Sequence, residues 1–296
     1  MYKRYPAGHP AGAKEAFMKK LIPMILLTLL LLSGCRSRET YELVATTAPV
    51  CQFAQALCEG TELTVGLVVS DSVSCLHDYT LSVNQMVAVE QAETVILSGA
   101  GLEAFMEDAL QSKTDRIDCS AGIDLLPSEE SGLDPHIWLD PDNASVMAAN
   151  IAAGLSERYP QYAATFSENL AALQARLSAL KSDGLAALSG LSCRELVTFH
   201  DGFAYFADAF DLTILAAIEE EAGSEASAHD LEAIADLIRD RSLPAVFTEK
   251  NGSASAAGIL SRETGCKVGT LDLGLSGSDY FDAMNANIQA ILEAMS

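Results

Sequence analysis

Short apolar runs alternate with helical patterns along most of the chain, which predicts parallel β-sheets of the α/β class. In the first half the predicted strands and helices are, in chain order, Tyr41–Thr46, Pro49–Cys58, Leu63–Val69, Ser82–Glu90, Thr94–Ser98 and Leu102–Leu110. In the second half the series runs through Glu195–Phe199, a segment near Ala207–Leu212, Ala228–Asp240, Ala245–Thr248, Ser253–Thr264 and Lys267–Leu271. We therefore expect two α/β lobes.

A single amphipathic helix is predicted between the two series. In the stretch Ala163–Leu188, leucines recur three or four residues apart at positions 170, 173, 177 and 180, which is the stripe of a helix with one buried face. At 1.5 Å per residue this helix is about 39 Å long, so it is a strut and not a flexible linker. We expect an N-terminal lobe over residues 35–160, a linking helix within 161–190 and a C-terminal lobe over 191–296.

The N-terminal segment predicts export. The apolar run 21–32 follows Lys19 and Lys20 and is shorter than the roughly 20 residues that span a bilayer, as is typical of a signal peptide. It ends in Leu-Ser-Gly before Cys35, which resembles the bacterial lipobox and implies that residues 1–34 are removed and Cys35 is lipidated. The alternative, a cysteine that ends a membrane helix, is disfavoured by the polar residues that follow. Translation from Met1 or from Met18 stays open.

Composition narrows the function classes. The 296 residues include 18 Lys and Arg against 41 Asp and Glu, for a net charge of −23. Without residues 1–34, which hold five bases and one acid, the count is 13 against 40 and the net charge is −27. Such an acidic chain is a poor partner for nucleic acid. With 49% hydrophobic and 20% charged residues, it is also too apolar to be disordered.

Six cysteines follow the predicted lipidation site, at positions 51, 58, 75, 119, 193 and 266. An even number in an exported protein permits disulfides, but the sequence does not resolve their pairing. Cys51 and Cys58 lie in one predicted helix, about 10 Å apart along its axis, which is too far for a direct bridge. Buried free thiols remain the alternative.

Four histidines are candidates for chemistry outside the signal segment. His77 follows the strand that ends near Val69, His200 ends the next lobe's first strand, and Asp272 ends another strand. Open α/β sheets bind ligands at this edge. His136 lies between two Asp-Pro pairs, close to the only Trp. Three imidazoles and one carboxylate suit a divalent transition metal, zinc above all. The fourth, His229, follows Ser227, a good helix N-cap, and is expected to be solvated.

Several motifs together carry a family resemblance. After the lipobox come Ala45-Thr-Thr-Ala-Pro49, His77-Asp-Tyr-Thr-Leu-Ser82, Asp134-Pro-His-Ile-Trp-Leu-Asp-Pro141, Phe199-His-Asp-Gly-Phe-Ala-Tyr-Phe206 and Leu271-Asp272. From about residue 40 onward the chain resembles the solute-binding lipoproteins of zinc and manganese ABC transporters, the TroA-like metal-binding lipoproteins. The segment 134–141 is the most specific part of this resemblance.

The resemblance implies two four-stranded α/β lobes joined by a rigid helix, with a metal ion in the cleft between them. It implies His77, His136, His200 and Asp272 as ligands, with Glu249 orienting an imidazole or closing the site. A histidine at position 200 is similar to the zinc-type branch. The implied function is non-enzymatic: a monomer, lipid-anchored on the outer face of the bacterial cytoplasmic membrane, captures Zn²⁺ or Mn²⁺ and delivers it to an ABC permease.

Two departures and two rival functions qualify this implication. Zinc-type relatives often carry a His-rich loop before the second ligand, but residues 128–133 contain no histidine. Cys75, two residues before His77, offers a thiolate ligand, although a disulfide or a buried thiol is favoured. The acidic run 219–221 is read as a solvated stretch and alternatively as a metal-attracting rim. A zinc hydrolase with Glu249 as its base lacks a His-Glu-x-x-His motif, and a surface adhesin would not need the ligand set.

Overall fold

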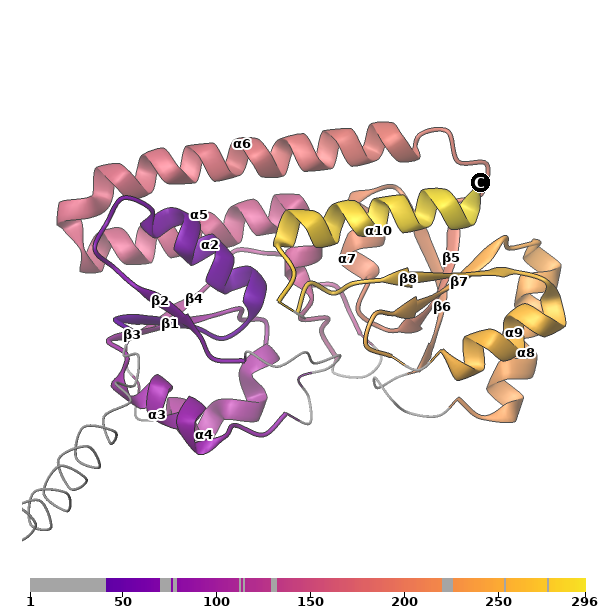
Figure 1. Ribbon diagram of the computed structural model, residues 1–296, viewed down its shortest axis with the longest axis horizontal. Helices are drawn as coiled ribbons and strands as arrows, with labels where there is room; N and C mark the ends of the chain where they lie inside the picture. Colours follow the sequence, from indigo (N-terminus) through magenta and orange to yellow (C-terminus); the bar gives the residue numbers. More distant parts are fainter. Residues whose placement is uncertain are drawn as a thin grey trace, which may run out of the picture. The chain divides into compact units, whose positions relative to one another are not determined.

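Two parallel four-stranded sheets form the framework of the protein (Figure 1). The computed structural model describes residues 41–296 except 70–75, 77–78, 112, 114, 129–131, 220–225, 253 and 276. The first sheet has the order β2-β1-β3-β4, with strands β1 Leu43–Ala45, β2 Val65–Leu67, β3 Thr94–Leu97 and β4 Arg116–Asp118. The second has the order β6-β5-β7-β8, with strands β5 Glu195–His200, β6 Thr213–Glu219, β7 Ala245–Glu249 and β8 Lys267–Leu271. The predicted α/β class is confirmed.

Helices cover and connect the sheets. Around the first sheet they are α2 Ala48–Cys58, α3 Val83–Gln91, the 3₁₀ turn η1 Leu102–Met106, α4 Glu107–Leu110, the 3₁₀ turn η2 Ile137–Leu139, α5 Pro141–Arg158 and the 3₁₀ turn η3 Pro160–Tyr162. After the long helix α6 Ala163–Leu188, those around the second sheet are α7 Ala204–Ala209, α8 Ala228–Arg241, α9 Ser255–Thr264 and α10 Tyr280–Met295. Within the described residues, no helix is long and apolar enough to cross a membrane.

Helix α6 has the bounds that the leucine pattern predicts. It packs against α2 and α5 from the first half and against α10 from the second, as Figure 1 shows. Gly184 permits one close contact, because a Cβ there would overlap Phe210 and Ile288. Near its other contact with α10, the Arg176 guanidinium lies 3.9 Å from the Phe281 ring centroid, a cation–π pair. The helix is therefore fixed along both halves.

The hydrophobic core explains why the two sheets hold together. The larger core is continuous, from Leu43 in β1 through Leu177 in α6 to Phe247 in β7. The neighbour of Phe247, Val246, belongs instead to a second, smaller core that also contains Ile238 of α8. This alternation follows from the two-residue period of side chains along a strand. The lobe boundaries expected near residues 160 and 190 stay predictions.

In the second half, the sequence pattern misplaced one segment and did not predict α10. The segment near Ala207–Leu212, expected to continue the strand and helix series, is the end of α7 and the turn that follows it, and β6 begins only at Thr213. The Phe206 and Phe210 rings are in contact, with centroids 4.7 Å apart and planes tilted by 50°, a contact that helical i, i+4 spacing creates. Asp211 then takes a φ of 56°, which ends the helix.

The described cysteines do not form disulfides. Cys51, Cys58, Cys119, Cys193 and Cys266 are free thiols. Burial raises the pKa of Cys51 to about 11 and that of Cys58 to about 12, so both are protonated at neutral pH and chemically inert. The alternative of buried free thiols is confirmed for Cys51, Cys58, Cys119 and Cys266, whereas Cys193 is free and half-buried. Cys75 lies outside the described residues, as does the whole segment before Tyr41.

Candidate metal-binding site

His136 is buried and its orientation is fixed by a carboxylate. Its Nδ1 lies 2.8 Å from Asp134 Oδ1, and the same oxygen accepts the His136 backbone N–H at 2.8 Å. An ionised carboxylate only accepts hydrogen bonds, so Nδ1 carries the proton and Nε2 keeps its lone pair. Carboxylates hold metal-binding histidines in this way. His136 is thus prepared to donate Nε2 to a cation.

The second half of the chain braces the segment that carries His136. The Tyr205 hydroxyl of α7 donates to the Asp134 carbonyl at 3.0 Å and accepts the Leu126 N–H at 2.9 Å. Burial raises the pKa of Tyr205 above its ordinary value, which keeps the hydroxyl protonated as this donation requires. Trp138 Nε1 donates to the Leu273 carbonyl at 2.8 Å. The position of His136 therefore depends on both halves.

His200 lies next to His136. It ends β5, and its ring centroid is 5.2 Å from that of His136 with the ring planes at 90°. Gly202 makes this approach possible, because a Cβ there would lie 2.7 Å from His200 Cδ2 and 3.0 Å from His136 Cε1. The two imidazoles that sequence analysis places in one site are thus brought together.

Asp272 follows β8 and is held by several groups. Its Oδ1 accepts the Gly274 N–H at 2.8 Å, and its Oδ2 accepts from Lys250 Nζ at 2.8 Å and Ser278 Oγ at 3.3 Å. Asn287 of α10 hydrogen-bonds both backbone groups of Asp272, at 2.7 and 2.8 Å. The carboxylate is buried and rigid, and an ammonium group is bonded to it.

Glu249 completes the polar edge of the second sheet. It ends β7, is buried, and stands opposite Leu271 in the register of β7 and β8. Because β5, β7 and β8 are neighbours and parallel, His200, Glu249 and Asp272 lie at one carboxyl edge, where α/β sheets bind ligands.

The full ligand set is not assembled within the described part of the chain. There, no group of three or more His, Cys, Asp and Glu side chains is arranged to hold a metal ion. His77, the third proposed imidazole, lies outside the described residues, as do Cys75 and Glu221. His136 and His200 are together, whereas Asp272 does not form a three-member group with them. His229 is exposed at the start of α8, where Ser227 forms a capping box with Asp230, as expected.

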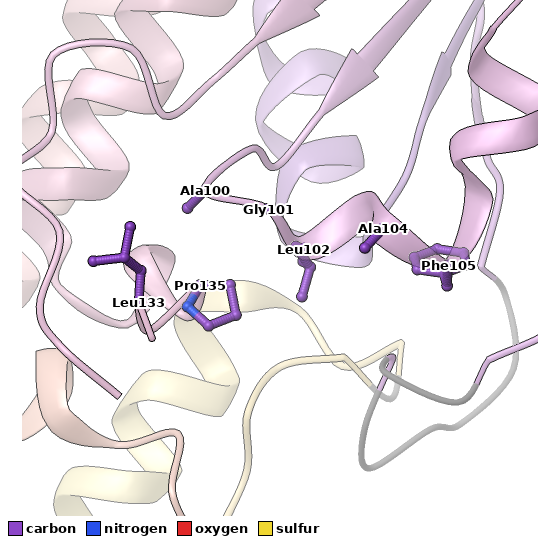
Figure 2. Close-up of a pocket in the computed structure, with 7 residues that line it drawn as sticks. All are labelled: Ala100, Gly101, Leu102, Ala104, Phe105, Leu133 and Pro135. Carbon is purple, nitrogen blue, oxygen red and sulfur yellow. The ribbon is translucent and has the colours of Figure 1, made fainter. Parts of the chain in front are cut away.

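An apolar pocket of about 450 Å³ lies beside the segment that carries His136 (Figure 2). Its lining residues come from η1 and its approach and from both sides of Asp134: Ala100, Gly101, Leu102, Ala104, Phe105, Leu133 and Pro135. None of these side chains is a metal ligand. The pocket borders the candidate site without contributing to it.

Sequence reasoning missed three residues that shape the site. Asp134 fixes the imidazole of His136, Tyr205 braces its segment, and Gly202 leaves room for two rings. A signal was present only for Asp134, which precedes the histidine by two residues in an Asp-Pro-His segment. A backbone N–H and a ring nitrogen at that spacing can both reach one carboxylate oxygen.

Comparison with known proteins gives a consistent result. The family model described as zinc-uptake complex component A, periplasmic, matches residues 43–294. The high-affinity zinc uptake system protein ZnuA of Haemophilus ducreyi is 27% identical over 279 residues, which cover 83% of this chain and 89% of that protein. The manganese-binding lipoprotein MntA of Halalkalibacterium halodurans is 28% identical over 233 residues, covering 74% and 77%.

A solved structure agrees with these matches. The crystal structure of ZnuA superposes with a TM-score of 0.78 at 29% identity, covering 87% of this chain and 100% of that one. The similarity therefore includes both sheets and the long helix between them.

Proposed function

The chain belongs to the family of periplasmic zinc-uptake complex component A proteins, and from this premise we propose that it captures zinc and hands it to an ABC permease. As a member of this family, it is the extracytoplasmic, non-enzymatic component of an ABC uptake system that binds divalent metal. The metal ion is its cargo. The choice of zinc, the ligands and the anchor are the parts proposed here.

The proposed ligands are His77, His136, His200 and Asp272, with Glu249 orienting an imidazole or closing the site. The observation that carries this proposal is the pair of buried imidazoles, 5.2 Å apart, in which Asp134 leaves His136 Nε2 as the donor atom. Two rings in this arrangement can converge on one cation, and His77 would add a third nitrogen. Asp272 would supply the oxygen once its ammonium partner moves.

Zinc is preferred in this proposal because of the chemistry of the donors. Imidazole nitrogen suits zinc, whereas carboxylate, carbonyl and water oxygens suit manganese. Relatives named for zinc and for manganese are about equally similar to this chain, at 27% and 28% identity. Sequence identity therefore does not distinguish zinc from manganese as the ligand, and the proposal rests on the chemistry of the donor atoms.

Lipid anchoring is a further part of the proposal. Residues 1–34 would be removed as a signal peptide, and Cys35 would carry the lipid. Expression of the full chain in a bacterium, with Cys35→Ala as the matched variant, tests this. We expect the wild-type protein in the membrane fraction and the variant outside it, and equal fractionation of the two would contradict anchoring.

A competition titration with zinc and manganese, repeated from pH 7.5 to pH 5.5 at fixed ionic strength, tests the metal site. We expect one zinc ion per chain and weaker binding of manganese. Metal affinity should fall steeply as the pH drops through about 6.5, the ordinary pKa of an imidazole, because only a neutral imidazole donates a lone pair. Attraction by the acidic chain alone would respond to salt and stay flat until about pH 4, so flat binding would refute a histidine site.

A further inference from the structure

Lys250 is the basic group bonded to the proposed carboxylate ligand. It directly follows Glu249 at the end of β7, and its backbone N–H donates to the Leu271 carbonyl at 2.8 Å. Gly252 N–H closes the turn onto the Glu249 carbonyl at 3.0 Å. These bonds fix the start of the Lys250 side chain beside Asp272. Its Nζ then lies 2.8 Å from Asp272 Oδ2 and 2.9 Å from Ser278 Oγ.

The two partners of this ion pair differ in freedom. The Asp272 side chain is 11% exposed and the Lys250 side chain is 47% exposed. Asp272 is held on its other oxygen by Gly274 and on its backbone by Asn287. Lysine has a flexible four-carbon stem that can turn its ammonium group into water at little cost. The carboxylate is therefore the fixed partner and the ammonium is the one able to leave.

We propose that Lys250 strengthens the preference for zinc over manganese by competing with the metal ion for the Asp272 carboxylate. This inference rests on the proposed function, because it takes Asp272 as a ligand. An ammonium on Oδ2 occupies the oxygen that a cation would use. A divalent ion that binds there must displace the ammonium or lie close to a like charge, which Coulomb repulsion opposes.

Competition for an oxygen ligand affects the two metals unequally. Zinc forms stable sites with imidazole nitrogens alone and an open position. Manganese depends more on carboxylate and other oxygen donors. Withholding Asp272 therefore weakens manganese binding more than zinc binding. Lys250 sharpens a preference that the histidines establish.

Lys250→Met in the full chain tests the proposal, since Met keeps an unbranched side chain and removes the charge. Zinc and manganese affinities are measured separately, at one pH and one ionic strength, for wild type and variant. We expect the variant to bind manganese about tenfold more tightly than wild type does, while its zinc affinity changes by less than about threefold. A coupling of this size is ordinary for contacting groups. Lys250→Arg, which keeps the charge, should retain the wild-type ratio.

Two further variants separate this effect from general charge and folding effects. Lys267→Met removes the same charge at the opposite end of β8, where Lys267 Nζ bonds the carbonyls of Glu293 and Ser296, and it should leave the metal ratio unchanged. In an Asp272→Asn background, adding Lys250→Met should also leave the ratio unchanged, because the competed carboxylate is gone.

The possible outcomes separate a failure of the role of Lys250 from a failure of the proposed metal-binding function. If wild type binds zinc and Lys250→Met shows the same zinc-to-manganese ratio, the role of Lys250 is refuted and the proposed function stands. An equal change in Lys267→Met would refute it as well, since net charge would then be the cause. A wild-type chain that binds neither ion would overturn both.

Discussion

The carboxyl edges of the two sheets differ sharply, although the sheets share one topology. In each sheet the first strand in chain order lies between the second and the third, and the fourth lies outside the third. The edge of the second sheet presents His200, Glu249 and Asp272. The edge of the first sheet, at the ends of β1 and β3, is filled by the chain itself.

A single buried carboxylate accepts hydrogen bonds from the groups at the ends of β1 and β3. Glu103 of η1 is 7% exposed, and its Oε1 accepts from Thr46 Oγ1 at 2.6 Å and from the Ser98 N–H at 2.7 Å. Its Oε2 accepts the Gly99 N–H at 3.1 Å. These donors are the strand-end groups that an anionic ligand would otherwise use. Burial raises the pKa of Glu103 to about 7, against these hydrogen bonds.

The comparison shows that topology provides an edge and side chains decide its use. At the described ends of β1 and β3, the polar groups of Thr46, Ser98 and Glu103 hydrogen-bond to one another. At the second edge, His136 reaches in from the η2 segment and places its ring against that of His200. We therefore expect the ends of β1 and β3 to contribute stability, and the second edge together with His136 to contribute the described part of the metal site, while His77, which follows β2, lies outside the described residues.

Replacing either of the paired imidazoles should weaken zinc binding, and this is the largest effect that we expect. We expect His136→Ala and His200→Ala each to weaken zinc binding about a thousandfold, close to 4 kcal/mol, because each removes a ligand. His229→Ala is the matched control, since that imidazole is exposed on α8. Affinities come from competition titration, with circular dichroism to confirm folding. Equal losses in all three variants would mean that position 229 supplies a ligand.

Glu103, at the first edge, should make the stability of the folded protein depend on pH. Its pKa is about 7 in the folded protein against an ordinary value of 4.5, so between these values the folded state binds the extra proton. Stability is then highest at low pH and falls as pH rises through this window, by about 3 kcal/mol from this group. Above pH 7 its contribution is constant.

Urea unfolding of wild type and Glu103→Gln at pH 5 and pH 8 measures this contribution. We expect the wild type to lose more stability than the variant over that interval. Glu107→Gln, an exposed carboxylate on α4, should behave as wild type does. Parallel profiles for wild type and Glu103→Gln would show that Glu103 is ionised throughout.

A smaller effect on metal binding is expected from Asp134, which acts through His136. Asp134→Asn keeps the shape of the side chain and removes the negative charge that fixes the imidazole. Loss of such a partner commonly weakens metal binding about 10–100-fold. Asp124→Asn is the control, because Asp124 is an exposed acid ten residues earlier in the chain. A variant that binds zinc as wild type does would show that Pro135 and η2 alone orient His136.

Periodic patterns predicted the elements with the clearest packing. The limits of α6 and β8 coincide with those expected from the sequence, because one has a leucine stripe and the other lies between two turns. The pattern gave no indication of α5, α10 or β4, and the three residues of β4 are buried only at Ile117. It also did not separate α7 from β6, because Phe206 and Phe210 are compatible with either structure until they pack together.

The neighbouring position of two imidazoles was predictable from the sequence, and the charged groups around Asp272 were not. The end of β5 and the Asp-Pro-His segment led to the expectation that His136 and His200 share one site. Their rings are adjacent, whereas their role as metal ligands stays a prediction. The pairing of Lys250 with Asp272 depends on the turn after β7 and on the loop after β8, which are 22 residues apart in the chain. Side-chain contacts of this kind leave no periodic trace in a sequence.

The smallest effect should come from a hydroxyl pair that belongs to the first edge alone. Thr47 Oγ1 and Ser98 Oγ are 2.7 Å apart and buried, and Thr47 makes no side-chain cap to α2 although it precedes that helix. Thr47→Ala therefore removes one buried hydrogen bond and should cost about 1 kcal/mol of unfolding free energy. Thr47→Ser, which retains the hydroxyl, should recover most of it. Zinc affinity should be unchanged in both variants. A Thr47→Ala protein that folds normally but binds zinc more weakly would show that the ends of β1 and β3 take part in binding, and the contrast with the ends of β5, β7 and β8 would fail.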